Sequence, residues 1–269
     1  MAELNWDQIY RPAAGAKQSA RHKSLAELAI VILVGLAGVG KTTTLELLAK
    51  SGVNFTLLPN RRKITDEIII TAMQQAAGET VQPVTDRLTR FEYTARYRAK
   101  YAGGMAHALS QLAVDPSQLT FPVIFDGLRG LDEVRQATRY FPHCRFIGLD
   151  APDTVRLSRL LHRGDIFDTT AGLPAARNDL LATLLNVPHI STVFNQEQLV
   201  QITRSAHQSQ LLPEEIIQKT SIIVKERHNY DSTAAWTFLA DKLPAERVLL
   251  LDTHTHPPAA VAEQIAEWL

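Results

Sequence analysis

Residues 35–43 have the types and spacing of a phosphate-binding loop. They read Gly-Leu-Ala-Gly-Val-Gly-Lys-Thr-Thr and fit the pattern G-x-x-x-x-G-K-[S/T], with Gly35, Gly40, Lys41 and Thr42 at its fixed positions. Such a loop wraps a phosphate chain with backbone N–H groups, and glycines permit the close approach and the positive φ values that this wrap needs. The lysine reaches the β- and γ-phosphates, and the threonine hydroxyl is a ligand for Mg²⁺. The sequence therefore predicts that ATP and Mg²⁺ bind here.

The segments on either side of the loop support this prediction. Residues 28–34 are seven consecutive apolar residues, which is typical of a strand buried on both faces. Residues 43–50 carry leucines at helical spacing, so we expect a helix whose N-terminus points at the phosphates. The alternative is a glycine-rich turn without a ligand. The predicted nucleotide-binding residues of the loop are Gly35, Leu36, Ala37, Gly38, Val39, Gly40, Lys41, Thr42 and Thr43.

The overall composition is that of a soluble globular protein. The chain has 269 residues, of which 45% are hydrophobic and 21% are charged. Its 28 basic and 28 acidic side chains leave no basic surplus, so we expect no nucleic-acid partner. A single cysteine, Cys144, is typical of a reducing compartment, and no apolar run reaches the roughly 18 residues of a membrane span. We therefore expect a cytoplasmic protein that does not associate with membranes.

Four further apolar runs predict the rest of a sheet. They are residues 53–59, 121–126, 144–149 and 247–252, and segments of helical character separate them. Strands that alternate with helices favour an α/β fold with a parallel sheet. The third strand ends at Asp126, and a carboxylate at the tip of such a strand can hold Mg²⁺ directly or through water. Thr42 and Asp126 are therefore the candidate metal ligands.

Two groups of arginines follow the second strand, toward the rim where open parallel sheets bind ligands. One group comes directly after the strand, and the other lies in a segment, 86–100, in which basic and aromatic residues are interleaved. A solvated surface is the alternative for both groups, and the aromatic spacing alone is weak evidence for single-stranded nucleic acid. The candidate acceptor-binding residues are Arg61, Arg62, Arg87 and Arg90.

A third group of arginines lies on the predicted helix after the fourth strand. Arg156, Arg159 and Arg163 are spaced i, i+3 and i+7, so they share one stripe of that helix. Beside the phosphates, such a stripe would offset negative charge on a phosphoryl group in transfer. The alternative is a set of salt bridges to the neighbouring acids Asp153 and Asp165.

The remaining segments carry few chemical signals. Residues 1–24 are mixed in character, and we expect a mobile lead-in. Residues 171–243 contain several short helical patterns, which we expect to form an inserted block of helices. His254 and His256 follow the last strand, but two ligands are too few to indicate a metal site. We expect that loop to lie near the base of the nucleotide.

Together these motifs resemble the nucleoside-monophosphate-kinase-like branch of the P-loop proteins. The chain is most similar there to adenylate kinases, dephospho-coenzyme A kinases and related archaeal P-loop kinases. The resemblance depends on four segments, residues 35–42, 125–130, 150–163 and 251–255. It implies a three-layer P-loop NTPase fold, with a five-stranded parallel sheet of order 2-3-1-4-5 and helices on both faces. It also implies one kinase-like domain over 25–269, with acceptor-binding helices in 61–119 and a lid in 153–170.

The resemblance further implies roles for individual side chains. Arg129 follows Asp126 in an Asp-Gly-x-Arg pattern and would contact the acceptor or the transferred phosphate. Arg156 would join the nucleotide-binding set, and the candidate catalytic residues are Lys41, Arg129, Arg159 and Arg163. The implied reaction transfers the γ-phosphoryl group of ATP to a small phosphorylated or nucleotide-like acceptor.

The large block at 171–243 leaves a second interpretation open. In this alternative, the protein is a nucleotide-gated regulatory or assembly ATPase, which binds a protein partner through those helices. A P-loop fold by itself does not decide between the two, because the same scaffold serves both uses.

Overall fold

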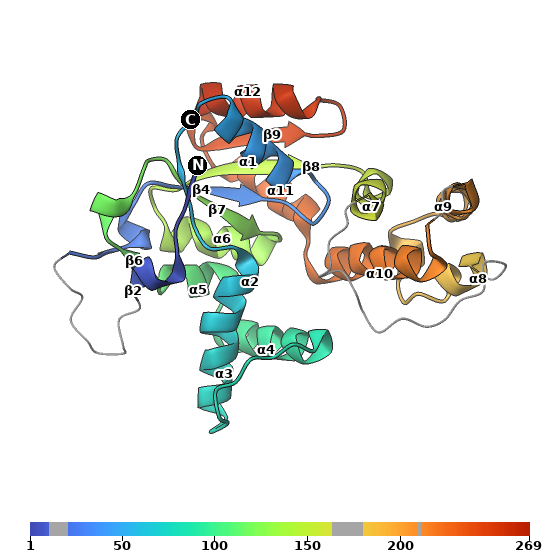
Figure 1. Cartoon of the computed structure of the whole chain (residues 1–269), viewed down its shortest axis with the longest axis horizontal. Helices are drawn as coiled ribbons and strands as arrows, with labels where there is room; N and C mark the ends of the chain where they lie inside the picture. The colour runs from blue at the N-terminus through green and yellow to red at the C-terminus, as the bar shows by residue number, and fades with distance from the viewer. Residues whose placement is uncertain (11–20, 163–179, 209–210) are drawn as a thin grey trace.

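A parallel sheet forms the centre of the protein (Figure 1). The computed structural model describes residues 1–10, 21–162, 180–208 and 211–269. Within these residues, six strands pair in the order β1-β5-β7-β4-β8-β9, and all neighbouring pairs are parallel. Their bounds in that order are Ala2–Glu3, Thr56–Leu57, Val123–Leu128, Ile30–Val34, Arg145–Asp150 and Val248–Asp252.

The five predicted strands are present in the predicted order, 2-3-1-4-5, and the α/β P-loop fold is confirmed. The sheet has one strand more than the five expected, because Ala2 pairs with Thr56 and Glu3 with Leu57 at its edge. This first part of residues 1–24 therefore belongs to the sheet. Residues 11–20 of the same lead-in lie outside the described residues.

The central strand β4 is buried on both faces because helices cover the sheet from both sides (Figure 1). Its residues alternate between two apolar cores, with Ile30 and Ile32 on one side and Val31 and Leu33 on the other. Helices α1 (Lys41–Lys50) and α12 (Pro258–Trp268) pack on one face. Helices α5 (Met105–Ser110), α6 (Leu131–Tyr140) and α11 (Ser232–Lys242) cover the other. The apolar run at 28–34 thus supplies the predicted buried strand over Ile30–Val34, whereas Ala29 precedes the strand and is exposed.

The register of β4 and β7 places Asp126 beside the start of the loop. Leu33 pairs with Asp126, and the register shifts at the next position, so that Val34 pairs with Leu128. The peptide N–H of Gly35 then donates to the carbonyl of Leu128. The carboxylate therefore lies at the C-terminal end of the sheet, next to the loop that follows β4.

A helical arm extends from the sheet between β5 and β7 (Figure 1). It consists of α2 (Arg61–Ile64), a π-helical stretch η3 (Thr65–Ile70), α3 (Thr71–Ala76) and α4 (Arg87–Lys100). The predicted helical region 61–119 also contains β6 (Ala113–Val114), which pairs with β2 (Ile9–Tyr10) and β3 (Lys23–Ser24) in a small antiparallel sheet. Three short turns of helix accompany these elements, at Trp6–Gln8 (η1), Leu25–Glu27 (η2) and Pro116–Gln118 (η4).

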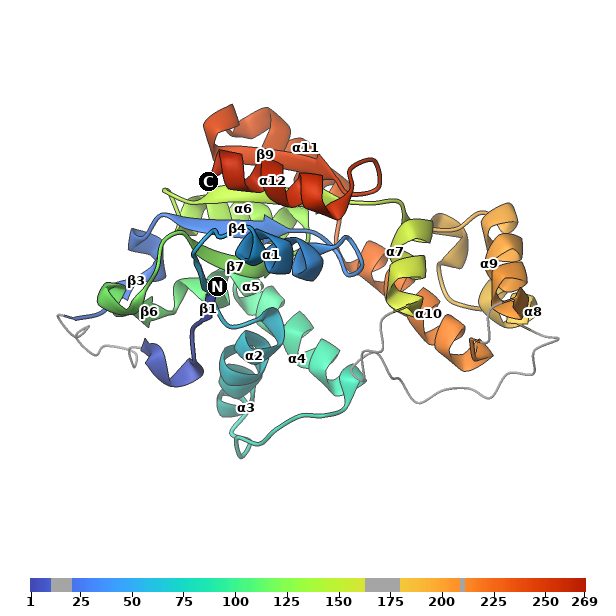
Figure 2. The same cartoon turned by 45° about the horizontal axis from the view of Figure 1, so that its top comes forward.

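Four helices pack together at one end of the sheet around an apolar core of their own (Figure 2). We call this group the satellite. They are α7 (Asp153–Leu161), α8 (Leu180–Leu185), α9 (Gln196–Gln208) and α10 (Pro213–Asn229), with a turn at Ile190–Thr192 (η7). Their own apolar core includes Leu160, Leu184, Phe194 and Ile223. The last helix of the expected block, α11, instead packs on α6 and β9, and a turn at Ala245–Arg247 (η8) joins it to β9. No described helix is long and apolar enough to cross a membrane.

Candidate functional site

The glycines of the loop serve two different physical needs. Gly38 and Gly40 have φ values of 82° and 99°, which favour glycine. A Cβ at Gly38 would also lie 2.7 Å from the carbonyl oxygen of Arg156. Gly35 has no positive φ; a Cβ there would lie 2.6 Å from the carbonyl oxygen of Leu149. Gly35 is therefore required for packing against β8, whereas we had expected all three glycines to serve the phosphate wrap.

The ammonium group of Lys41 is held at the centre of the loop. Its Nζ donates to the carbonyl oxygens of Gly35 at 3.0 Å and Leu36 at 3.2 Å, and it lies 3.6 Å from Oδ1 of Asp126. Burial lowers the pKa of Lys41, and the charge of Asp126 opposes this shift. A positive charge at the start of α1 and beside glycine N–H groups favours an anion at this point.

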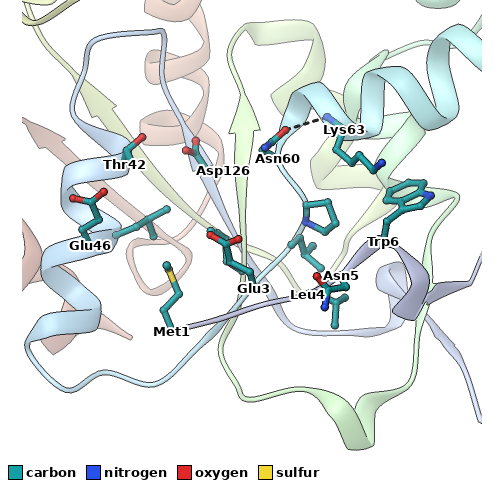
Figure 3. A pocket seen from close by; sticks show the side chains of 14 residues that line it. Met1, Glu3, Leu4, Asn5, Trp6, Thr42, Glu46, Asn60, Lys63 and Asp126 are labelled. Atoms are coloured by element: carbon teal, nitrogen blue, oxygen red, sulfur yellow. Dashed lines mark hydrogen bonds between the residues drawn. The ribbon is translucent and has the colours of Figure 1, made fainter. Parts of the chain in front are cut away.

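Thr42 and Asp126 fit the requirements of a Mg²⁺ site. Within the described part of the chain, Oδ1 of Asp126 is buried and has no hydrogen-bond partner, as a ligand atom for a cation would be. The exposed Thr42 lies at the same edge as Asp126 (Figure 3). Mg²⁺ commonly takes one or two protein oxygens and keeps several waters, so this pair of oxygens suits it. The described residues contain no group of three or more His, Cys, Asp or Glu side chains suited to a metal.

A cavity of about 440 Å³ lies on the outer side of the loop, within the range of roughly 300–1,000 Å³ for small-molecule sites. Residues of the loop and of α1 line it, together with Arg129, which follows β7, and Arg159 of α7. Thr253, which follows β9, and Pro258 and Val261 of α12 complete the lining. The loop residues in its wall are Ala37, Gly38, Gly40, Lys41, Thr42 and Thr43.

Arg159 ties three segments together beside this cavity. Its guanidinium donates to the carbonyl oxygen of Gly38 at 3.2 Å and to Oγ1 and the carbonyl oxygen of Thr253 at 2.9 and 2.7 Å. The Thr253 hydroxyl in turn donates to the carbonyl oxygen of Val39 at 2.8 Å. The charge of Arg159 is thereby fixed at the cavity wall by α7 and by the end of β9.

Arg156 has a different position from the one expected. Its side chain is 0% exposed and contacts the loop from behind, and it does not line the cavity described above. It donates to the carbonyl oxygen of Ala37 at 2.8 Å and pairs with Asp153 at 2.5 Å and Glu226 at 2.7 Å. The salt bridge to Asp153 that we had considered as the alternative is therefore present. The third member of the stripe, Arg163, lies outside the described residues.

Glu226 on α10 is a residue of the site that the sequence did not indicate. One carboxylate oxygen accepts from the N–H of Ala37 at 2.9 Å and from Arg156, and the other lies 2.6 Å from the guanidinium of Arg129. Burial raises the pKa of Glu226, but Arg129, Arg156 and the Ala37 N–H outweigh it, so the pKa is lowered. Because Glu226 is 189 positions from Ala37, no local pattern could reveal the contact.

The arginines proposed for the acceptor are largely committed to other partners. Arg61 pairs with Glu133 at 2.6 Å and also donates to the carbonyl oxygen of Gly127 and to the hydroxyl of Tyr230. Arg90 pairs with Asp66 and donates to the carbonyl oxygen of Val84. Arg61 and Arg90 are thus held in ion pairs within the chain, and their role in acceptor binding stays a prediction.

For the other two proposed acceptor residues, Arg62 and Arg87, acceptor binding stays a prediction. Arg62 also takes part in an interaction within the described chain. The side chain of Arg87 lies outside the described residues.

A parallel sheet with this glycine loop between β4 and α1 defines a P-loop nucleotide-binding domain. The sequence matches the family described as AAA domain over residues 31–172, which is more than half of the chain. The chain belongs to this family. A comparison with curated proteins gives no match.

Solved structures give weak likenesses. A sugar kinase from Janibacter sp. HTCC2649, in its unliganded structure, is 17% identical, with a TM-score of 0.36 and coverage of 89% of this chain and 93% of that chain. A gluconokinase from Sinorhizobium meliloti 1021 is 12% identical, with a TM-score of 0.36 and coverage of 89% and 94%. A sulfotransferase from Alicyclobacillus acidocaldarius is 9% identical, with a TM-score of 0.37 and coverage of 90% and 80%. Likenesses at this level carry no argument about function.

Proposed function

We propose that this protein is an ATP-dependent phosphotransferase that acts on a small-molecule acceptor. The observation that carries the proposal is the position of Thr42, which lines two separate cavities. The cavity beside Arg159, described above, suits the nucleotide. The second, of about 450 Å³, lies on the side of Asp126 and Asn60. A triphosphate on the loop would thus reach from a donor cavity to an acceptor cavity, an arrangement that a transferase requires.

The residues present would act by positioning and by charge. Lys41 and Arg129 would offset negative charge on the phosphates, and Arg159 would hold the donor cavity in shape. Bound Mg²⁺, held by Thr42 and Asp126, would neutralise part of the phosphate charge. In the transfer, an acceptor oxygen bonds to the γ-phosphorus and the bond to the β,γ-bridging oxygen breaks. Its electron pair leaves with ADP, and any proton on the acceptor oxygen passes to water.

The test is incubation of the purified full chain with γ-labelled ATP, Mg²⁺ and a panel of acceptors. The panel includes nucleotides, nucleosides, pantothenate derivatives, sugars and amino alcohols. We expect the label to appear on one class of acceptor. Binding of ATP with the label retained, or released only as inorganic phosphate, would contradict the transferase.

A second candidate is a nucleotide-gated regulatory ATPase that binds a protein partner through residues 171–243. The observation that favours it is Glu226, which connects α10 directly to the N–H of Ala37 in the loop. A change in the loop on nucleotide binding would then alter this contact and change the structure or the dynamics of the satellite helices. Hydrogen exchange of α8, α9 and α10 with and without ATP tests this idea, since unchanged exchange in all three helices would exclude such gating.

A cytoplasmic location stays a prediction from the single cysteine. Cys144 is buried, and burial raises its pKa to about 11 while Arg247 opposes the shift. The thiol is therefore protonated near neutral pH and unreactive.

A further inference from the structure

A cavity of about 450 Å³ lies at the carboxyl ends of three neighbouring strands, β1, β5 and β7 (Figure 3). Thr42 and Asp126 lie at one edge of the cavity, Trp6 and Lys63 lie at the opposite edge, and Asn60 lies between Asp126 and Lys63 (Figure 3). Ligands of open parallel sheets bind at this rim. The position next to the candidate metal ligands makes this cavity the acceptor side of the proposed reaction.

The ionisable side chains of this cavity are mainly acidic. Glu3, Glu46 and Asp126 line it, together with Lys63 and with Met1, which carries the cationic α-amino group. The charge of Asp126 already faces Lys41, whose Nζ lies 3.6 Å away, so Glu3 and Glu46 are the acids that remain without an ion-pair partner in the described chain. The Nζ of Lys63 is already paired with Glu67 at 2.8 Å. Among the described residues, neither Glu3 nor Glu46 has an ion-pair partner, and both are exposed to the cavity or solvent. Both carboxylates are therefore available to a cationic ligand.

The same cavity offers little to a phosphate group. Arg61 and Arg90, which could have supplied guanidinium groups, pair with Glu133 and Asp66 instead. No arginine of the described chain belongs to the cavity wall. A phosphate would face carboxylates of the same sign, and such repulsion disfavours binding.

We propose that this cavity binds the acceptor, and that the acceptor is a hydroxyl-bearing amine, such as an amino alcohol or an amino sugar, without a phosphate group. The proposal rests on the proposed function and replaces the phosphorylated acceptor expected from the sequence. Glu3 and Glu46 supply the negative charge that attracts the ammonium group into the cavity. The hydroxyl group then lies toward Thr42 and Asp126, where the γ-phosphate would be. Trp6 supplies an aromatic surface at the far edge for the carbon skeleton.

Calorimetry on the full chain, saturated with Mg²⁺ and a non-hydrolysable ATP analogue, tests the site. The probes are three amines (ethanolamine, glucosamine and 2-deoxystreptamine), the matched neutral sugar glucose, and the anions glucose 6-phosphate and AMP. We expect at least one of the amines to bind, and glucosamine to bind about ten-fold more tightly than glucose, as one charge-assisted hydrogen bond allows. Tighter binding of glucose 6-phosphate or AMP than of every amine would overturn the proposal, as would no binding of any amine.

Two variants assign the binding to this cavity. Glu3→Gln and Glu46→Gln should each weaken the binding of the best amine about ten-fold while the affinity for the ATP analogue is unchanged. Glu197→Gln, an exposed acid on α9 in the satellite, is the matched control and should change neither affinity. An amine that binds equally well to both cavity variants occupies another site, and the assignment fails.

The outcomes separate this inference from the proposed function. The binding measurement requires no phosphoryl transfer. Amine binding that depends on Glu3 and Glu46, together with no transfer of label from ATP, would leave the site in place and refute the transferase. Transfer of label to a nucleotide or a sugar phosphate would support the transferase and refute the amine acceptor.

Discussion

Lys41 combines burial with a positive charge in a loop of backbone N–H groups. Its Nζ contacts two carbonyl oxygens of the loop and lies 3.6 Å from Asp126. We predict that Lys41→Ala weakens ATP binding at least ten-fold, because a charge-assisted contact with the phosphates is lost, and abolishes transfer. Calorimetry and labelled ATP measure the two effects. Lys50→Ala, at the exposed end of the same helix, is the control, and unchanged turnover in Lys41→Ala would refute the assignment.

Asp126 supplies the carboxylate proposed for Mg²⁺. We predict that Asp126→Asn raises the Mg²⁺ concentration needed for half-maximal ATP turnover about ten-fold, because the amide keeps the shape but removes the charge that attracts the ion. A titration of turnover against Mg²⁺ checks this. Asp241→Asn, an exposed acid on α11, should leave the titration unchanged. An identical curve for Asp126→Asn would show that Asp126 holds no metal.

At the scale of elements, α10 joins the satellite to the loop through one carboxylate. The pKa of Glu226 is lowered because its arginine and N–H partners outweigh burial, so its contribution to stability is fully present above its ordinary pKa of 4.5. This contribution is lost as the pH falls through the lower pKa of the folded state. We predict that Glu226→Gln lowers the free energy of unfolding by about 3 kcal/mol at pH 7, the cost of breaking a buried pair.

Urea unfolding at pH 7 and at steps down to pH 3.5 measures this effect. The difference between the wild type and Glu226→Gln should shrink as the pH falls below 4.5, because the unfolded wild type takes up a proton there while the folded carboxylate keeps its charge down to its lower pKa. Glu263→Gln, at an exposed position of α12, is the control and should follow the wild type. A difference that stays constant across this pH range would mean that the carboxylate charge of Glu226 is not what stabilises the contact.

At the scale of the whole molecule, the donor cavity exists only when β7, α1, α7 and the start of α12 are assembled. A nucleotide that binds only the folded chain stabilises it by mass action, about 2.7 kcal/mol at one hundred times Kd. We predict that saturating ATP and Mg²⁺ raise the Tm by roughly 5–10 °C, at about 2–4 °C per kcal/mol for a chain of this size. Thermal unfolding followed by fluorescence measures the shift. An equal shift in Lys41→Ala would place the nucleotide elsewhere.

The sequence by itself determined the loop and five strands of the parallel sheet. The apolar run of β4 and the glycines at 38 and 40 are local signals, because burial on two faces and a positive φ each restrict the residue type at that position. The strand order followed from the resemblance. Strands of two residues, such as β1 and β6, escaped detection because so short a segment shows no alternation, and its pairing depends on the partner strand.

Only the tertiary structure decided what the charged side chains do. Long arginine side chains form ion pairs with carboxylates that are distant along the chain, as Arg61 does with Glu133 and Arg156 with Glu226. The spacing of residues along one helix does not predict such pairs. Burial then decides which charges remain open to a ligand, and burial is a property of the packed molecule. The loop was therefore readable in the sequence, whereas the acidic character of the second cavity emerged only when Glu3, Glu46 and Asp126 came together from three separate elements.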